Sequence, residues 1–476
     1  MEQLIGRKSE QDKLVKCFAS RRAEFVVVCG RRRIGKTFLV RQFFNNNFTF
    51  EFVGGHKKPY QEQLLGFSLA LYKYGWEGSA TSVKNWYDAF RGLRELIERS
   101  PSDGRKVIFI DEMPWIDTLK SSFVLALEDF WNSWAAYRTD VMLVACGSAT
   151  SWMTDKILNN RGGLHNRITE YIYLAPFSLN ETEQYLNGYL HCNWRRELIA
   201  QCYMALGGVP YYLSKISPSL GVEQNIDQLM FSRDGALKHE FDELYNALYT
   251  NADNYIAVVT ALAQKRMGMT RKELAAKTKV DGGTLTRVLT NLERNDFIQG
   301  FAQYSLPKAK VIYRLTDFYS LFYLKFVDND RSGDEQKWTH MIGSGTVNAW
   351  RGHTFELLAL LHVNQIKQRL GIGGMLTSVS SWRSRSSGEQ IDLLIDRVDN
   401  IINICEMKFT NLPFEITKSY AEHLQERMAH FAQEKKCRKS LLLTMVTSAG
   451  VASNSHSHIV QNEVTLDDLF VPYRKY

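Results

Sequence analysis

The stretch FVVVCGRRRIGKT, residues 25–37, constrains the fold more than any other part of this sequence. An apolar run typical of a buried strand leads into Gly30-x-x-x-x-Gly35-Lys36-Thr37, and the helically spaced FLVRQFF follows. This is the P-loop pattern in the strand–loop–helix context that the pattern requires. Its glycines allow backbone N–H groups to turn inward around phosphate groups. The stretch therefore predicts an α/β core that holds the phosphates of ATP.

Two polar side chains at the end of this loop have expected roles. Lys36 is placed to reach the β and γ phosphates, and Thr37 is placed to coordinate Mg²⁺. The arginines at 31–33 either face phosphate or line the rim of the site, and we expect the rim. The nucleotide contacts expected in this loop are Gly30, Arg33, Ile34, Gly35, Lys36, Thr37 and Phe38.

A second apolar run, KVIFIDEMPW, ends in an acidic pair. Acids at the end of a buried strand are the usual partners of a P-loop, in the arrangement known as Walker B. Asp111 is expected to hold Mg²⁺ directly or through water, and Glu112 to polarise the attacking water as a general base. The alternative is an acidic pair that merely lies at an exposed strand end.

Further segments carry a family resemblance. LIGRKSEQDKL near the N-terminus, RIT…LAPFS (residues 167–178) and GGVPYYL (residues 207–213) occur in order around the P-loop and the acidic pair. Residues 1 to roughly 240 thereby resemble the STAND and archaeal-type branch of AAA+ ATPases. The resemblance implies a RecA-like core followed by a helical lid. It places Gly207, Gly208 and Pro210 in the lid near the nucleotide, although a tight turn between helices explains them equally well.

Two polar residues beyond the acidic pair have open roles. Ser148 ends a third apolar run, DVMLVACGS, and the resemblance implies that it senses the γ-phosphate; by itself it is equally compatible with a turn. Arg167 either reaches a phosphate, in cis or across a subunit boundary, or lies in a solvated loop.

Residues 255–315 predict a winged helix-turn-helix. TRKELAAKTKV opens with a capping box between Thr270 and Glu273, and DGG separates it from TLTRVLTNLERN. The latter has an apolar face formed by Leu285, Val288, Leu289 and Leu292, and a hairpin with Lys308 and Lys310 follows. If this module binds DNA, the helix from Thr284 enters the major groove and the lysines contact phosphate. The alternative is a module that only packs between domains.

The C-terminal stretch IDLLIDRVDNIINICEMKF, residues 391–409, predicts a hairpin that carries charged residues. Glu406 and Lys408 are two residues apart and therefore share one face of a strand. Asp392 joins that face only if it pairs opposite Glu406, which leaves a loop of about five residues. Glu356, in the first turns of a helix expected from WRGHTFELL, supplies a further acid.

This order of an acid, a second acid and acid-x-lysine is the one that a restriction-type nuclease needs. Asp392 and Glu406 would bind Mg²⁺ or Mn²⁺, and Lys408 would help to position the attacking water. Residues 340–476 resemble the PD-(D/E)XK-like domain of unknown function that is fused to archaeal-type ATPases. The alternatives are acids of a solvated hairpin and a nuclease fold that has lost activity.

The complete prediction is an α/β chain with four domains. They are a P-loop ATPase core at 1–178, a helical lid at 179–245, a winged helix at 246–330 and a restriction-endonuclease-like domain at 331–476. The expected activity is ATP hydrolysis coupled to a nuclease-like domain acting on DNA. The expected biological setting, by analogy, is defence against foreign DNA. The rival hypothesis is an ATP-dependent switch or DNA-binding regulator whose last domain is a non-catalytic docking module.

The bulk composition sets the expected environment. The net charge of +8 suits an anionic partner such as DNA, but says nothing about the fold. Seven cysteines without a CxxC pair are typical of reduced thiols, and no apolar run is long enough to span a bilayer. We therefore expect a cytoplasmic protein with ATP, Mg²⁺ and DNA as ligands, no membrane contact, and either self-association or a protein partner.

Overall fold

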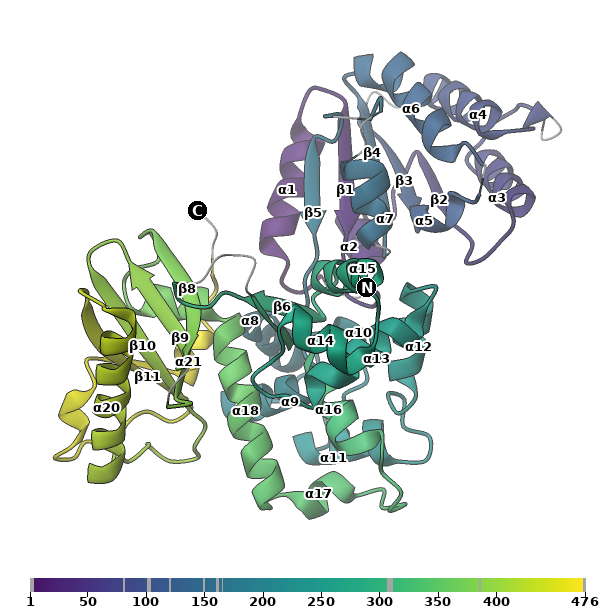
Figure 1. Ribbon diagram of the computed structural model, residues 1–476. Coiled ribbons are helices and arrows are strands. Elements are labelled where there is room, and N and C mark those ends of the chain that lie inside the picture. Colours follow the sequence, from purple (N-terminus) through teal and green to yellow (C-terminus); the bar gives the residue numbers. More distant parts are fainter. Residues whose placement is uncertain are drawn as a thin grey trace. The chain divides into compact units, whose positions relative to one another are not determined.

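The computed structural model describes residues 4–79, 82–100, 104–119, 121–148, 150–159, 162–164, 166–305, 311–384 and 387–473. Its internal contacts separate the chain into two compact units, residues 1–176 and residues 177–476. Each unit is described by itself (Figure 1). Within the described ranges, no helix has the length and apolar character needed to cross a membrane. All seven cysteines are free thiols.

The first unit is built on a five-stranded parallel sheet with the order β2-β3-β4-β1-β5. The central strands β1, β3 and β4 are buried along their whole length, as expected for a parallel sheet covered on both faces. Alternate residues of β1 pack into separate cores, with Phe25 and Val27 on one face and Val26 and Val28 on the other. The strands are β1 (Glu24–Cys29), β2 (Phe50–Val53), β3 (Lys106–Asp111), β4 (Val141–Gly147) and β5 (Glu170–Tyr173).

Helices cover both faces of this sheet, α1 and α2 on one and α3, α4 and α6 on the other (Figure 1). Their apolar stripes supply the two cores, so the sheet is enclosed and its strand ends stay at the surface. The helices are α1 (Lys8–Ala19), α2 (Lys36–Phe43), α3 (Tyr60–Lys73), α4 (Trp86–Arg99), α5 (Met113–Ile116), α6 (Phe123–Ser133) and α7 (Thr150–Trp152).

The second unit begins with helices and continues into the segment expected to be a winged helix. Its first helices are α8 (Leu179–Glu183), α9 (Arg196–Leu206), α10 (Pro210–Leu213), α11 (Val222–Ile226) and α12 (Glu240–Leu248). Then come α13 (Ala252–Ala263), α14 (Arg271–Thr278), α15 (Gly282–Arg294) and the antiparallel pair β6 (Ile298–Phe301) and β7 (Ile312–Leu315).

Several local expectations for this segment are confirmed. Thr270 and Glu273 form the capping box of α14, and the four apolar residues expected on one face of α15 are buried. Lys308 and Lys310 lie outside the described residues. The elements occur in the expected order, but the winged-helix assignment and the domain boundaries at 245 and 330 remain predictions.

The rest of the second unit carries a mixed sheet with the order β12-β11-β10-β9-β8. Its strands are β8 (Thr377–Arg383), β9 (Gln390–Arg397), β10 (Ile401–Lys408), β11 (Ser440–Thr447) and β12 (Asn462–Thr465). The helices are α16 (Phe318–Phe322), α17 (Lys337–Met341), α18 (Gly345–Leu361), α19 (Val363–Arg369), α20 (Lys418–Lys435) and α21 (Leu466–Leu469).

The two faces of this sheet pack against different helices. Ile404 of β10 packs with Phe431 of α20, whereas Cys405 belongs to the core that contains Phe355 of α18. The helix α18 starts at Gly345, where Ser344 caps it, and not near Trp350 as expected. Glu356 therefore lies in the body of α18 rather than in its first turns.

Candidate functional sites

The P-loop of the first unit adopts a backbone that its glycines make possible. Gly30 has φ +148°, and a Cβ there would lie 2.3 Å from the carbonyl oxygen of Leu174. Gly35 has φ +84° and is the N-cap of α2, with no atom within 4 Å of a Cβ position. The loop thus combines a close backbone contact at its start with open space at the helix N-terminus, where phosphate groups bind.

The side chains of Thr37 and Asp111 meet although β4 separates the strands that precede them. The Thr37 hydroxyl donates to Asp111 Oδ2 at 2.6 Å. A hydroxyl and a carboxylate in contact are the kind of hard oxygen donors that Mg²⁺ takes, so the residues present fit this ion. Lys36 is buried, and its Nζ donates to the carbonyl oxygen of Arg31 at 2.9 Å, across the loop.

The two acids at the end of β3 face different partners. Asp111 Oδ1 accepts from the backbone N–H of Glu112 at 2.8 Å, while its other oxygen faces Thr37. Glu112 has φ +47° and caps α5. Its carboxylate accepts from the hydroxyl of the buried Ser148 at 2.7 Å. Ser148 is therefore in contact with the expected general base.

The remaining expected nucleotide contacts are placed less specifically. Arg33 has φ +70°, Ile34 is buried, and Phe38 is half-buried in the first turn of α2. Arg167 is exposed before β5, and no hydrogen bond or ion pair of its side chain to the P-loop occurs within the described ranges. The roles of these residues remain predictions.

Sequence reasoning missed Arg7. This residue precedes α1, is buried, and donates from Nη2 to the carbonyl oxygen of Ile34 at 3.3 Å. The contact ties the segment before α1 to the P-loop. The signal was present in LIGRKSEQ, where a basic residue lies directly before a helix, but nothing in the sequence reveals its partner.

The hairpin β9–β10 has the register that the acid-x-lysine hypothesis requires. Cys405 pairs with Leu393 and Ile404 with Leu394. One further step along this antiparallel register places Glu406 opposite Asp392, so their side chains share one face of the sheet. The expected five-residue loop, 397–401, separates the paired residues Asp396 and Ile402.

Glu406 is held by three side chains. Lys408 Nζ lies 2.9 Å and Arg427 Nη2 2.6 Å from its carboxylate, and the Tyr420 hydroxyl donates to it at 2.5 Å. Burial works against the charged form, yet Arg427 and Lys408 outweigh it and lower the pKa of Glu406. The carboxylate is therefore ionised, with its charge balanced by α20 and by β10 itself.

The other two acids are also paired with arginines, one that follows α13 and one that lies in β7. Arg314 Nη2 lies 3.0 Å from Asp392, and Arg266 bonds to Glu356. Burial, and then the nearby charge of Asp392, raise the pKa of Glu356 to about 7.

In this arrangement the two acids expected to bind a metal ion are paired with cationic side chains, and their role as metal ligands remains a prediction. Asp392 and Glu406, the expected ligands, both face cationic side chains. Across the described part of the chain, no group of three His, Cys, Asp or Glu side chains is arranged to hold a metal.

Comparisons with known proteins found a family model and a curated relative. Residues 4–216 match the model of a family described as an ATPase domain predominantly from Archaea. Over 399 residues the chain is 24% identical to the uncharacterized protein MJECL04 of Methanocaldococcus jannaschii, which covers 82% of this chain and 83% of that protein.

The solved structures that match part of this chain include two proteins. The Walker-type ATPase PABY2304 of Pyrococcus abyssi matches with a TM-score of 0.48 and 18% identity, over 68% of this chain and 96% of that chain. The ORC2 protein of Aeropyrum pernix, in ADPNP and ADP complexes, matches with a TM-score of 0.40 and 12% identity, over 71% of this chain and 96% of that chain.

The family match concerns one part of the molecule. Residues 4–216 are similar to ATPase domains of the archaeal type. The match covers less than half of the 476 residues, so it describes this domain and not the C-terminal sheet.

Proposed function

We propose that the protein binds ATP at the P-loop and hydrolyses it with Glu112 as the residue that polarises the attacking water. The observation that carries this proposal is the contact between Thr37 and Asp111, which joins the phosphate loop to the acidic strand end. Thr37 and Asp111 would hold Mg²⁺, which when bound neutralises charge on the β and γ phosphates.

Each residue of the site has a different role when ATP binds. Lys36 exchanges the carbonyl oxygen of Arg31 for phosphate oxygens when ATP is bound. Glu112 accepts a hydrogen bond from water in place of the one that it accepts from Ser148. Ser148 thereby acts as a positioning residue that keeps the carboxylate at the end of β4 until water is aligned.

ATP binding and turnover by three variants test this proposal. Glu112→Gln should retain ATP binding and lose turnover by about 10²- to 10⁴-fold, the usual contribution of a general base. Lys36→Ala should lose binding itself. Glu62→Gln, at an exposed position in the first turn of α3, is the matched control and should behave as wild type. Unchanged turnover in Glu112→Gln would assign the water to another residue.

The second candidate function is metal-dependent cleavage of DNA by the second unit. The register that puts Asp392 opposite Glu406 supports it, because it brings the two expected metal ligands to one face of the sheet. The arginine pairs favour the rival hypothesis of a non-catalytic docking module, because each acid is already charge-balanced.

A cleavage assay separates these two possibilities. Wild type, Arg266→Ala, and Arg266→Ala combined with Lys408→Ala are incubated with duplex and single-stranded DNA and Mn²⁺, with and without ATP. Cleavage that appears or rises in Arg266→Ala and disappears with Lys408→Ala supports a nuclease. The absence of cleavage in every lane, with ATP hydrolysis intact, supports the docking module.

A further inference from the structure

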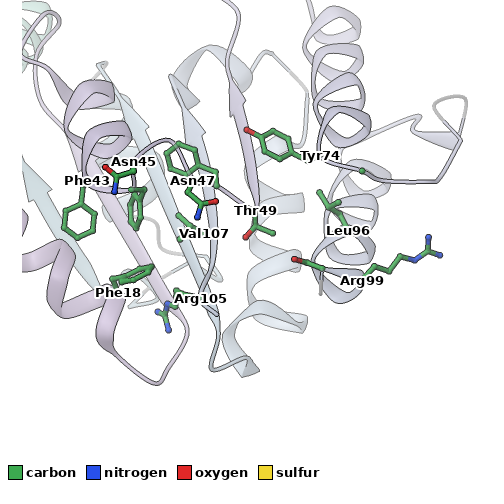
Figure 2. A pocket seen from close by; sticks show the side chains of 14 residues that line it. Phe18, Phe43, Asn45, Asn47, Thr49, Tyr74, Leu96, Arg99, Arg105 and Val107 are labelled. Atoms are coloured by element: carbon green, nitrogen blue, oxygen red, sulfur yellow. The ribbon is translucent and has the colours of Figure 1, made fainter. Parts of the chain in front are cut away.

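A large cavity lies at the end of the first unit's sheet that is opposite the P-loop. Its volume is about 700 Å³. Thr49 and Arg105, which line it, come just before β2 and β3, and Phe18 and Phe43 lie at the ends of α1 and α2 (Figure 2). The P-loop follows the other end of β1. The cavity is therefore separate from the nucleotide site, and its volume is typical of a ligand pocket.

Aromatic rings form much of its wall. Phe18 packs edge-on against Phe44, with ring centroids 5.7 Å apart, and Phe43 does the same at 4.9 Å. Phe18 keeps 44% of its surface exposed, although burial of a phenylalanine side chain is favourable. Tyr74 and Leu96 face the same space from the side of α3 and α4 (Figure 2). The wall thus offers ring surfaces on which a flat group can stack.

None of the lining residues is acidic, and two are arginines. Arg99 forms an ion pair with Glu77 at 3.0 Å and its guanidinium points away from the cavity (Figure 2), so Arg105 is the cation that the cavity offers to a ligand. Arg105 donates through Nη1 to the carbonyl oxygens of Ser20 and Thr139, both at 2.9 Å, while its Nε and Nη2 have no hydrogen-bond partner. Burial lowers the pKa of Arg105 more than the nearby Glu24 raises it. A partly buried guanidinium that lacks a carboxylate partner favours an anionic ligand.

Two exposed amides complete the lining. Asn45 and Asn47 follow α2, and their side chains make no hydrogen bond with other described residues. An amide has both a donor and an acceptor, which is the combination that pairs with the edge of a nucleobase. Rings, amides and an unpaired guanidinium are together the groups that bind a base and its phosphate.

We propose that this cavity binds a nucleotide unit, with the base on the ring surfaces of Phe18 and Phe43 and the phosphate beside Arg105. The same chemistry is offered by a single-stranded nucleic acid and by a free mononucleotide. Such a site goes beyond ATP hydrolysis, because it lies at the other end of the sheet and works with the P-loop filled.

The test is a binding titration on full-length protein saturated with ADP and Mg²⁺, so that the P-loop is occupied. A fluorescein-labelled oligothymidylate is followed by anisotropy, and thymidine monophosphate is the competitor. The variants are Phe18→Ala, whose side chain is already partly exposed, and Arg105→Met. Tyr137→Ala is the matched aromatic control, because the Tyr137 side chain is 82% exposed and does not line the cavity.

The expected result is a loss of affinity of about 5- to 100-fold in Phe18→Ala, which corresponds to one base stacked on an aromatic ring. Arg105→Met should make the dependence of log K on log salt shallower by roughly 0.7, the value for one phosphate of a single strand. Tyr137→Ala should change neither quantity. If Arg105→Met fails to fold, Asn47→Ala takes its place, with a loss of affinity and no change of slope.

The competitor identifies the source of the nucleotide. Binding that grows with strand length and resists thymidine monophosphate assigns the cavity to single strands, and full displacement by the mononucleotide assigns it to free nucleotides. Equal binding by Phe18→Ala, Tyr137→Ala and wild type would overturn the proposal. So would the failure of wild type to bind either probe.

Discussion

At the scale of single residues, the backbone decides where the P-loop can form. Gly30 and Gly35 both have positive φ, but they differ in what surrounds them. A Cβ at Gly30 would meet the backbone of Leu174, the residue directly after β5, and this backbone is held because the Leu174 N–H donates to the carbonyl oxygen of Cys29. At Gly35 the space is open, so only the conformation itself demands glycine.

Gly30→Ala should therefore destabilise the first unit and abolish ATP binding. The backbone conformation costs about 1–3 kcal/mol for a residue with a Cβ, and the 2.3 Å approach to Leu174 O adds to it. Binding of a fluorescent ATP analogue and the free energy of unfolding in urea measure the two effects. Gly188→Ala, where nothing lies within 4 Å of the new Cβ, is the control and should be nearly neutral. Normal ATP binding by Gly30→Ala would contradict the role given to this glycine.

A buried histidine makes the stability of the second unit depend on pH. His362 donates through Nδ1 to the carbonyl oxygen of Leu358 at 2.8 Å, and its Nε2 accepts from the backbone N–H of Leu179 at 3.4 Å. Both nitrogens are used by the neutral ring, and burial lowers the pKa of His362 to about 4. The unfolded chain binds a proton at higher pH than the folded chain does.

Stability should therefore fall as the pH drops from about 6.5 to about 4, by about 3 kcal/mol from this residue. Above pH 6.5 the ring is neutral in both states and the contribution is complete. Urea unfolding of wild type and His362→Asn across this window measures the difference. The variant should have a smaller pH dependence but not a flat one, because burial also lowers the pKa of His353, to about 3. An identical pH dependence in both proteins would show that His362 does not titrate as inferred.

At the scale of elements, α20 is attached to the sheet by charge as well as by apolar packing. Phe431 packs against Trp382 with ring centroids 5.4 Å apart. One turn earlier, Arg427 and Glu406 form an ion pair in which both side chains are largely buried, with 12% and 14% exposed. A buried ion pair stabilises little by itself, but removal of Arg427 leaves the charge of Glu406 balanced only in part, by Lys408 of its own strand.

Arg427→Met should destabilise the second unit by less than the roughly 3–5 kcal/mol of a wholly unpaired buried charge, because Lys408 still contacts Glu406, and Arg427→Met combined with Glu406→Gln should cost less again. The reason is that the double variant removes both charges and keeps most of the volume. Urea unfolding of the two variants and of Glu406→Gln completes a double-mutant cycle. Arg438→Met, at an exposed position before β11, is the control. Equal losses in the single and double variants would mean that the ion pair is not what holds α20.

At the scale of the whole molecule, the contacts divide into two units that carry different sites. The P-loop and the opposite cavity lie in residues 1–176, and the arginine-paired acids lie in residues 177–476. A ligand that binds only the folded form of one unit stabilises that unit by mass action.

Calorimetry should accordingly resolve two transitions, of which ADP and Mg²⁺ raise only one. At a ligand concentration about 100-fold above Kd, the stabilisation is about 2.7 kcal/mol. The Lys36→Ala variant should lose this shift and keep both transitions. A single transition that moves as a whole with ADP would mean that the units unfold together and that the nucleotide site is coupled to the acids.

Local patterns were enough to predict the elements that carry both candidate sites. The P-loop lies between β1 and α2, Asp111 ends β3, and β9 and β10 form the expected hairpin. These features depend on residues close in sequence, since periodicity, glycine positions and loop length act over a few residues. The helix α18 starts earlier than the apolar pattern predicts, because the side chain of Ser344 caps it before the apolar run begins.

The sequence by itself determined the phosphate loop and its acidic partners. The structure decided the register that puts Asp392 opposite Glu406, because the alternation of side chains alone leaves the register open. Only the tertiary structure decided which charges meet. Arg266 and Glu356 are 90 residues apart, and Arg7 meets Ile34 across 27 residues. Such pairs follow from how helices and strands pack, and no local pattern encodes them. The aromatic cavity has the same origin, because its wall combines the ends of α1, α2 and α4 with the starts of β2 and β3.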